Sequence, residues 1–265
     1  EYNNLLVEVT DGIALVTLNR PQALNALNKA LLDELSHFIT VAQEDKAIRV
    51  IILTGAGEKS FVAGADIKEF ASFNGEQGER LAAEGQVNVF NKVENSCKPV
   101  IAAVNGFALG GGLELSMASH FRIASTNAKM GLPEVTLGLI PGYGGTQRLP
   151  KLIGKGRAMQ AIMTAEMFSA ERALEIGLVN EVVDLENLLP RCKEIAEKIT
   201  KNSSVAIAKA IKAVNDSDKE YGFETEIKSF GYLFDQEDFK EGTTAFIEKR
   251  LSLIHISEPT RRYAI

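Results

Sequence analysis

Short runs of β-forming residues alternate with helical stretches over the first two thirds of this 265-residue chain. The strand-like runs are Val50–Thr54, Val100–Val104 and Phe121–Ala124, with a weaker fourth at Leu178–Val183. The helical stretches between them are roughly Gln77–Asn95 and Leu113–Ala118. Alternation of this kind is typical of an α/β fold, in which helices cover a largely parallel sheet. We therefore expect an α/β core.

The chain begins with a pattern typical of a β-hairpin. Leu5–Thr10 and Ile13–Asn19 are β-rich and are separated by the dipeptide Asp11-Gly12. Both of its residues tolerate the positive φ that a tight hairpin turn requires. Asn25–Gln43 follows, with apolar residues at the spacing of an amphipathic helix. We expect a hairpin and then a long helix before the first buried strand.

The last quarter of the chain has a different pattern. From about Leu185 onward every segment is helical: Asn187–Lys201, Val205–Asn215, Gly222–Phe234 and Glu237–Lys249. No Pro/Ser-rich linker precedes them, so we expect a helical appendage that packs on the core. The expected division is a core with the active site over 1–190, a helical trimerisation region over 191–250 and an atypical tail over 251–265. The tail has no helical period and is interpreted as a read-through artefact or a disordered end.

Charge and composition exclude several classes of protein. The formal net charge is −6 and 45% of the residues are hydrophobic, so neither nucleic acid nor an anionic membrane is an expected partner. The N-terminus lacks a signal peptide pattern, and the most apolar window, Pro99–Leu113, is too short and too glycine-rich to span a bilayer. Cys97 and Cys192 are far apart, which argues against a disulfide framework and favours the reducing cytoplasm.

A glycine-rich segment, Asn105–Glu114, follows the Val100–Val104 strand and precedes a short helix. Glycines at such a turn let a ligand approach the backbone. The N–H groups at a helix start have no internal partners and attract negative charge. Glu114 would lie beside that charge. A turn of glycines followed by a Glu that complements the helix dipole explains the same residues.

A second carboxylate, Glu134, stands between Pro133 and the mostly apolar run Val135–Leu139. Partial burial there would raise its pKa and suit acid–base chemistry. The alternative is a Glu that caps the following turn. Glu114 and Glu134 are 20 residues apart in the sequence, which leaves enough chain to bring them together. Two carboxylates around one water can divide the acid and base roles, but spacing alone does not require the pairing.

Other motifs are weaker. Gly55-Ala56-Gly57 lacks the third glycine of a dinucleotide fingerprint, and a tight turn after a strand is favoured. The three histidines have no metal-ligand spacing, so no metal site is predicted. The sequence contains no Gly-x-Ser-x-Gly, so a serine-hydrolase elbow is not indicated.

These segments, with others in the same order, resemble the crotonase (enoyl-CoA hydratase/isomerase) family, in particular its short-chain enoyl-CoA hydratases. The matching stretches are Asn19–Pro21, Ala23–Leu27, Ala63–Lys68, Pro99–Glu114, Pro133–Glu134, Gly142 with Gly144–Leu149, Ala173 with Gly177–Val179, and Thr244–Phe246 with Glu248–Arg250. The resemblance implies a spiral of repeated ββα units with C-terminal helices. It also implies a homotrimer or a homohexamer made of two trimers.

The resemblance also implies residue roles. The backbone N–H groups of Ala65 and Gly111 fall on the family's oxyanion hole, and Glu114 and Glu134 on its catalytic carboxylates. The positions that fall near the acyl-CoA are Ala23, Leu24, Ala63, Asp66, Ile67, Lys68, Gly142 and Lys249. The implied reaction is reversible hydration of a trans-2-enoyl-CoA, with no cofactor beyond the coenzyme A of the substrate.

Departures from the family pattern bear on the substrate. Leu113 and Leu132 replace residues that line or support the pocket, and Gln22 replaces a frequent Lys near the coenzyme A. Three alternatives stay open at this stage: another acyl-CoA enzyme such as an enoyl-CoA isomerase, a non-catalytic RNA-binding relative, and a structural subunit of a larger complex.

Overall fold

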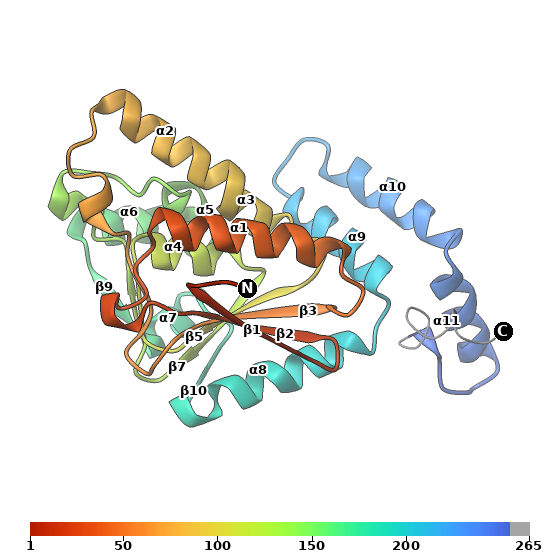
Figure 1. Cartoon of the computed structure of the whole chain (residues 1–265). Coiled ribbons are helices and arrows are strands. Elements are labelled where there is room, and N and C mark those ends of the chain that lie inside the picture. The colour runs from red at the N-terminus through yellow and green to blue at the C-terminus, as the bar shows by residue number, and fades with distance from the viewer. Residues whose placement is uncertain (255–265) are drawn as a thin grey trace.

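The computed structural model describes residues 1–254 and has two sheets, with helices on both sides of the larger one (Figure 1). The larger sheet has the order β1-β2-β3-β5-β7-β10. Its strands are β1 (Leu5–Thr10), β2 (Ile13–Leu18), β3 (Val50–Gly55), β5 (Val100–Val104), β7 (Phe121–Ser125) and β10 (Glu181–Val183). Only the β1–β2 pair is antiparallel among its described strands, and Asp11 and Gly12 join that pair with φ of 51° and 81°. The predicted hairpin is confirmed.

The smaller sheet has the order β4-β6-β8-β9. Its strands are β4 (Ser60–Ala63), β6 (Phe107–Leu109), β8 (Lys129–Gly131) and β9 (Met167–Ser169). β3, β5 and β7 lie side by side in the larger sheet, and the strands that follow them, β4, β6 and β8, lie side by side in the smaller one. Each turn of the chain therefore repeats one strand in each sheet before its helices. This repetition confirms the predicted spiral of ββα units.

The helices of the core cover both sheets. They are α1 (Lys29–Glu44), α2 (Gly75–Gly85), α3 (Asn91–Glu94), α4 (Gly111–Ala118), α5 (Gly145–Ile153), α6 (Lys155–Thr164) and α7 (Ala170–Glu175). Short 3-10 turns cover Pro21–Ala23, Ile67–Glu69 and Glu134–Leu137. A π-helical stretch over Gln86–Phe90 joins α2 to α3, so the predicted helix over Gln77–Asn95 is one continuous helical run with a wider turn inside it.

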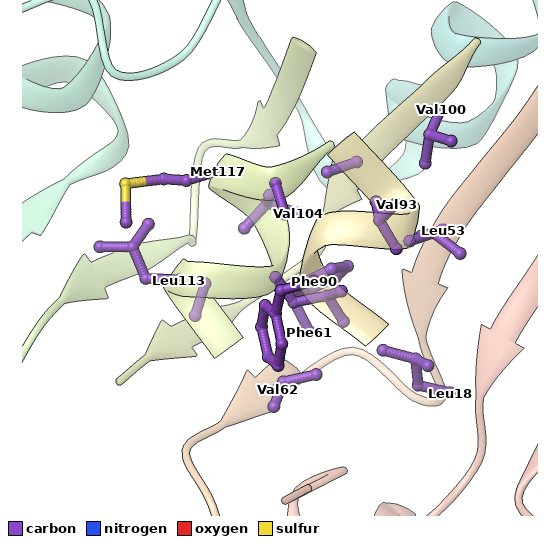
Figure 2. Packing of buried hydrophobic residues seen from close by; sticks show 14 of the residues in the cluster. Leu18, Leu53, Phe61, Val62, Phe90, Val93, Val100, Val104, Leu113 and Met117 are labelled. Atoms are coloured by element: carbon purple, nitrogen blue, oxygen red, sulfur yellow. The ribbon is translucent and has the colours of Figure 1, made fainter. Parts of the chain in front are cut away.

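The strands β3 and β5 are buried on both faces, which explains their continuous apolar sequences. Ile51 and Leu53 belong to a cluster with residues of α1, whereas Val50 and Ile52 belong to a second cluster with Leu188 of α8 (Leu185–Thr200). Successive side chains of a strand point to opposite faces, so the sheet separates two apolar layers. Figure 2 shows part of the larger cluster, with Phe61, Phe90 and Leu113 labelled.

The C-terminal helices are α8, α9 (Ser204–Asn215), α10 (Gly222–Phe234) and α11 (Glu237–Ile247). α8 packs under the larger sheet, and α9 to α11 lead away from it to one end of the molecule (Figure 1). The expected boundary at residue 190 falls inside α8, and the assignment of 191–250 to trimerisation stays a prediction. Of the expected tail, residues 255–265 lie outside the described part of the chain.

Two local expectations need correction. The strand expected over Leu178–Val183 is only β10 (Glu181–Val183), because Leu178 and Val179 complete the bend after α7, where their amides donate to the carbonyl of Ala173. The helix expected from Asn25 begins at Lys29. Asn25 lies in a turn with φ of 59°, and the Asn28 side chain caps the helix by accepting from the Leu31 amide at 2.9 Å.

Candidate active site

A cavity of about 860 Å³ opens where α2 and the starts of α4 and α5 meet the end of β4. Ala65, Gly111, Glu114 and Glu134 all line it. Apolar side chains form much of the remaining wall, among them Phe70, Phe73, Leu81, Leu137 and Ile140. The structure thus brings together four predicted site residues that lie up to 69 positions apart in the sequence (134 − 65 = 69).

The amide of Gly111 is the first of α4, so it has no partner within the helix. Gly110 precedes it with φ of 52°, a conformation that favours glycine. Gly112 lets the helix approach β4 closely, since a Cβ there would lie 2.0 Å from the Val62 carbonyl oxygen. Within residues 1–254, no acceptor is hydrogen-bonded to the Gly111 N–H. The helix start therefore presents a free amide to the cavity.

The second amide, that of Ala65, has no hydrogen-bond partner among the described residues for a different reason. Ala65 forms an isolated parallel bridge with Leu27. The Leu27 amide donates to the Gly64 carbonyl at 2.9 Å, and the Asp66 amide donates to the Leu27 carbonyl at 2.7 Å. In this parallel bridge both bonds are made by the residues that flank Ala65, namely Gly64 and Asp66. The amide of Ala65 itself therefore points away from Leu27. The Ala65 N–H accordingly has no hydrogen-bond partner in the described part of the chain.

Glu114 lies in the first turn of α4, and only 1% of the residue is exposed. Its Oε1 accepts from the Tyr143 amide at 2.9 Å and from the Gly145 amide at 2.8 Å. Burial raises the pKa of Glu114 to about 7, with a further contribution from Glu134, while the two amides oppose the rise. Near neutral pH this carboxyl can therefore both accept and hold a proton.

Glu134 follows Pro133 at the start of the 3-10 turn Glu134–Leu137 and is partly buried. Burial raises its pKa as well. Its Oε2 is buried with no hydrogen-bond partner among residues 1–254. A Cβ at Gly110 would lie 2.7 Å from the Oε1 of Glu134, so only glycine leaves room for this carboxyl. A protonated carboxyl costs less to bury unpaired than an ionised one.

The predicted acyl-CoA residues fall into two groups. Ala63, Ile67 and Gly142 line the cavity. Ala23, Leu24, Asp66, Lys68 and Lys249 do not. Most of the second group lies next to the first, since the Ala63 amide donates to the Leu24 carbonyl at 3.1 Å, and Asp66 and Lys68 flank Ile67.

Lys249 is exposed and follows α11, at the end of the molecule away from α2 (Figure 1). Its own chain therefore does not bring it to the cavity. The contacts of all five residues with coenzyme A stay predictions.

The sequence did not single out the residues that hold Glu114 in place. Tyr143 and Gly145 supply its amide donors, Gln86 donates to the Gly142 carbonyl at 2.6 Å, and Arg148 donates to the Tyr143 carbonyl at 3.0 Å. The sequence feature that could have indicated these residues is the glycine-rich segment Pro141–Thr146. A backbone that presents several amides to one carboxylate needs tight bends, and bulky residues resist such bends.

Neither a metal cluster nor a membrane span is found in the described residues. No group of three or more His, Cys, Asp or Glu within residues 1–254 is arranged to hold a metal ion. None of the helices in that range is both long and apolar enough to cross a membrane.

Comparison with known proteins gives a consistent result. The enoyl-CoA hydratase/isomerase family matches residues 8–253. A short-chain-enoyl-CoA hydratase of Clostridium acetobutylicum is 50% identical over 255 aligned residues, and the match covers 94% of this chain and 97% of that protein. A crotonyl-CoA hydratase of Syntrophomonas wolfei is 47% identical over 252 residues, covering 94% of this chain and 96% of the relative.

A solved structure extends the comparison to the fold. The crystal structure of an enoyl-CoA hydratase from Bacillus anthracis superimposes with a TM-score of 0.88 at 44% identity, over 94% of this chain and 98% of the other. Family, relatives and fold agree along nearly the whole described length. The chain belongs to the enoyl-CoA hydratase/isomerase, or crotonase, family.

Proposed function

We propose that this protein is an enoyl-CoA hydratase that adds water reversibly to a short-chain trans-2-enoyl-CoA and forms the 3-hydroxyacyl-CoA. One observation carries the proposal: two carboxylates with raised pKa values, Glu114 and Glu134, line the same cavity as two unpaired backbone amides. Short acyl chains and crotonyl-CoA are named for the relatives from Clostridium acetobutylicum and Syntrophomonas wolfei. No further cofactor enters the reaction as proposed.

The amides of Ala65 and Gly111 form the oxyanion hole in this proposal. They donate to the thioester carbonyl oxygen, which makes C3 of the enoyl group more electrophilic. The same donors then stabilise the enolate-like oxygen that forms when water adds. Donors that await developing charge in a water-poor site are worth about 3–4 kcal/mol each. Gly111 has the further advantage of the positive end of the α4 dipole.

The carboxylates divide the proton transfers. Glu114 takes a proton from the attacking water, and protonated Glu134 gives one to C2, so the hydroxyl forms at C3. The pair still holds one proton, and its return from Glu114 to Glu134 restores the starting state. Two amides bind one oxygen of Glu114, which favours its ionised form. The unpartnered buried oxygen of Glu134 favours its neutral form. The two groups titrate as a coupled pair.

The coenzyme A contacts extend this proposal beyond the cavity. We assign the acyl-CoA to a path along Ala63 and Ile67, next to Leu24 and Lys68. α11 lies away from the cavity of its own chain, so we assign Lys249 to the coenzyme A bound by a neighbouring copy. These contacts need an assembly in which C-terminal helices cross between subunits.

We further propose that residues 191–250 assemble the chain into a homotrimer or a homohexamer. The strongly exposed apolar side chains of α10 and α11, among them Phe223, Phe246 and Ile247, support this assignment because a monomer gains nothing from them. We place the protein in the cytoplasm, where the free thiols of Cys97 and Cys192 would stay reduced.

The test is hydration of crotonyl-CoA, followed by loss of the enoyl thioester absorbance. We expect Glu114→Gln and Glu134→Gln each to lower kcat by about 10²–10⁴-fold, the usual contribution of a positioned acid or base. Glu171→Gln, on an exposed position of α7, should leave the rate unchanged. Product analysis separates a hydratase from an isomerase, because only the former yields a 3-hydroxyacyl-CoA. Full activity in both carboxylate variants would refute the assignment.

A further inference from the structure

One buried cation of the core takes no part in the proposed proton transfers. Arg148 lies on α5, and only 8% of the residue is exposed. Its Nε donates to Glu94 Oε1 at 3.1 Å, and its Nη2 donates to Glu94 Oε2 at 2.8 Å. Nη2 also donates to the Asn91 side chain at 3.1 Å. α3 therefore holds the guanidinium in a fixed plane by a two-pronged ion pair.

The remaining nitrogen of this fork points at the bend that holds Glu114. Nη1 of Arg148 donates to the Tyr143 carbonyl oxygen at 3.0 Å. Gly144 follows with φ of 97°, and a Cβ there would lie 2.2 Å from that same nitrogen. The guanidinium thus lies against the peptide between the two amides, of Tyr143 and Gly145, that donate to Glu114.

We propose that Arg148 is a positioning residue for the hydration reaction: through the Tyr143 carbonyl it fixes the two amides that orient Glu114 toward the attacking water. The inference rests on the proposed function, since it gives Arg148 the role of positioning Glu114, the base of that reaction. Glu94 and Asn91 act one step further back, because they hold the guanidinium and not the bend. Phe90, at the end of the π-helical stretch, stacks on the Tyr143 ring with the ring centroids 4.7 Å apart.

The charge of Arg148 adds a second, measurable effect. Besides burial, four groups act on the pKa of Glu114 from the elements around it: Glu134 raises it, whereas the amides of Gly145 and Tyr143 and the charge of Arg148 lower it. Burial raises the pKa of the Tyr143 hydroxyl to about 12, so this group stays neutral near neutral pH. Loss of the Arg148 charge should therefore raise the pKa of Glu114, which is already raised by burial. A base with a higher pKa becomes active at higher pH.

The experiment compares Arg148→Gln, Arg148→Lys and Glu94→Gln with the unaltered protein, measuring kcat, KM and the pH profile of kcat with crotonyl-CoA. Arg148→Gln should lower kcat by about 100-fold, as small displacements of a catalytic group do, with little change in KM. The acid limb of the profile should move to higher pH. Arg148→Lys should restore the position of that limb but only part of kcat, because an ammonium cannot reproduce the planar fork.

Glu94→Gln is the matched control, because it removes the ion pair but keeps the Arg148 charge and its contact with the bend. Its acid limb should not move upward, and kcat should fall less than in Arg148→Gln. A stability role alone would lower the unfolding temperature of both variants and leave the profile of each folded enzyme in place, and that result would overturn the inference.

The remaining outcomes also test the inference. If Arg148→Gln does not fold, Arg148→Lys becomes the test, and unchanged kcat in that variant overturns the inference. If the unaltered protein does not hydrate crotonyl-CoA, the proposed function has failed. If it does and Arg148→Gln matches it in kcat and profile, only the positioning role has failed.

Discussion

The short helix α4 and the longer helix α9 show how differently the two parts of this chain are built. α4 has eight residues and all of them are buried, including the carboxylate Glu114. α9 has twelve residues and none of them is buried, although it is the more regular amphipathic sequence. The core buries its apolar side chains against one another within a single chain. The helices after α8 leave apolar side chains exposed to solvent.

This difference separates the region that forms the active site, the core, from the region assigned to assembly, the helices α10 and α11. The cavity wall comes from the core alone, in segments between Ala63 and Gln147. Every feature that shapes the pKa of Glu114 is supplied by one chain: burial, two amide donors, a second carboxylate and a nearby cation. The exposed faces of α10 and α11 contribute nothing to that wall, and they would add stability only when a second copy covers them. Substitutions in the core should therefore change stability or activity, whereas substitutions in α10 and α11 should change association.

The largest effect should come from Gly112→Ala in the core. A Cβ there would lie 2.0 Å from the Val62 carbonyl oxygen, a backbone atom that cannot move alone, so α4 must shift away from β4. Overpacking of this kind costs about 3 kcal/mol or more. The shift also displaces the Gly111 amide and Glu114, so kcat for crotonyl-CoA should fall about 100-fold. Thermal unfolding and the hydration assay measure the two effects.

Gly156→Ala is the matched control, since it also places alanine in a helix of the core. A Cβ at Gly156 of α6 meets no atom within 4 Å. Alanine exceeds glycine in helix propensity by about 1 kcal/mol, so this variant should be slightly more stable and fully active. Equal behaviour of the two variants would contradict the tight contact between α4 and β4.

A smaller effect of opposite sign is expected when the buried charge is removed. Burial raises the pKa of Glu114 from 4.5 to about 7, so the folded protein holds this proton more tightly than the unfolded chain. Ionisation therefore destabilises the fold as the pH rises from 4.5 to about 7. Glu114→Gln escapes this cost and should be far less active yet more stable at pH 8, by up to about 3 kcal/mol.

The measurement is the unfolding temperature at pH 5 and at pH 8. The gain from Glu114→Gln should be large at pH 8 and small at pH 5, where the natural carboxyl is mostly protonated. Glu171→Gln, which is exposed, should show no gain at either pH. A gain of the same size at both values would mean that Glu114 ionises as freely in the folded protein as in the unfolded chain.

The core and the C-terminal helices also differ in how far the sequence predicted them. The larger sheet was predictable because β3 and β5 are continuous apolar runs, and α10 because its period matches a helix. The smaller sheet was not: β6, β8 and β9 have three residues each, too few to show a period. These strands form only because the spiral places them beside one another, and they bring Ala63 and Gly111 to one cavity.

The same limit applies to the site. Glu114 and Glu134 could be singled out individually, because each carboxylate stands in an apolar or glycine-rich setting. Their pairing, and the capture of Glu114 by the amides of Tyr143 and Gly145, depend on contacts across some 30 residues. Arg148 lies in a stretch that matches the family, but no role could be given to it, since a single arginine in a helical stretch is usually exposed. Burial of that guanidinium is a property of the folded core.

The smallest effect on the folded chain should come from Phe246→Ser in α11, and it tests the proposed assembly. Phe246 is 86% exposed, so its loss should change the stability of a single chain by no more than about 0.5 kcal/mol. If a second copy covers it, the same substitution removes about 2 kcal/mol of apolar burial at each contact and weakens association. Sedimentation velocity over a range of concentrations measures the mass of the assembly. Val41→Ser, at an exposed apolar position of α1 in the core, should leave that mass unchanged. Unaltered association of Phe246→Ser would place the subunit contacts elsewhere, and the apolar face of α11 would then have no part in the contrast between the two regions.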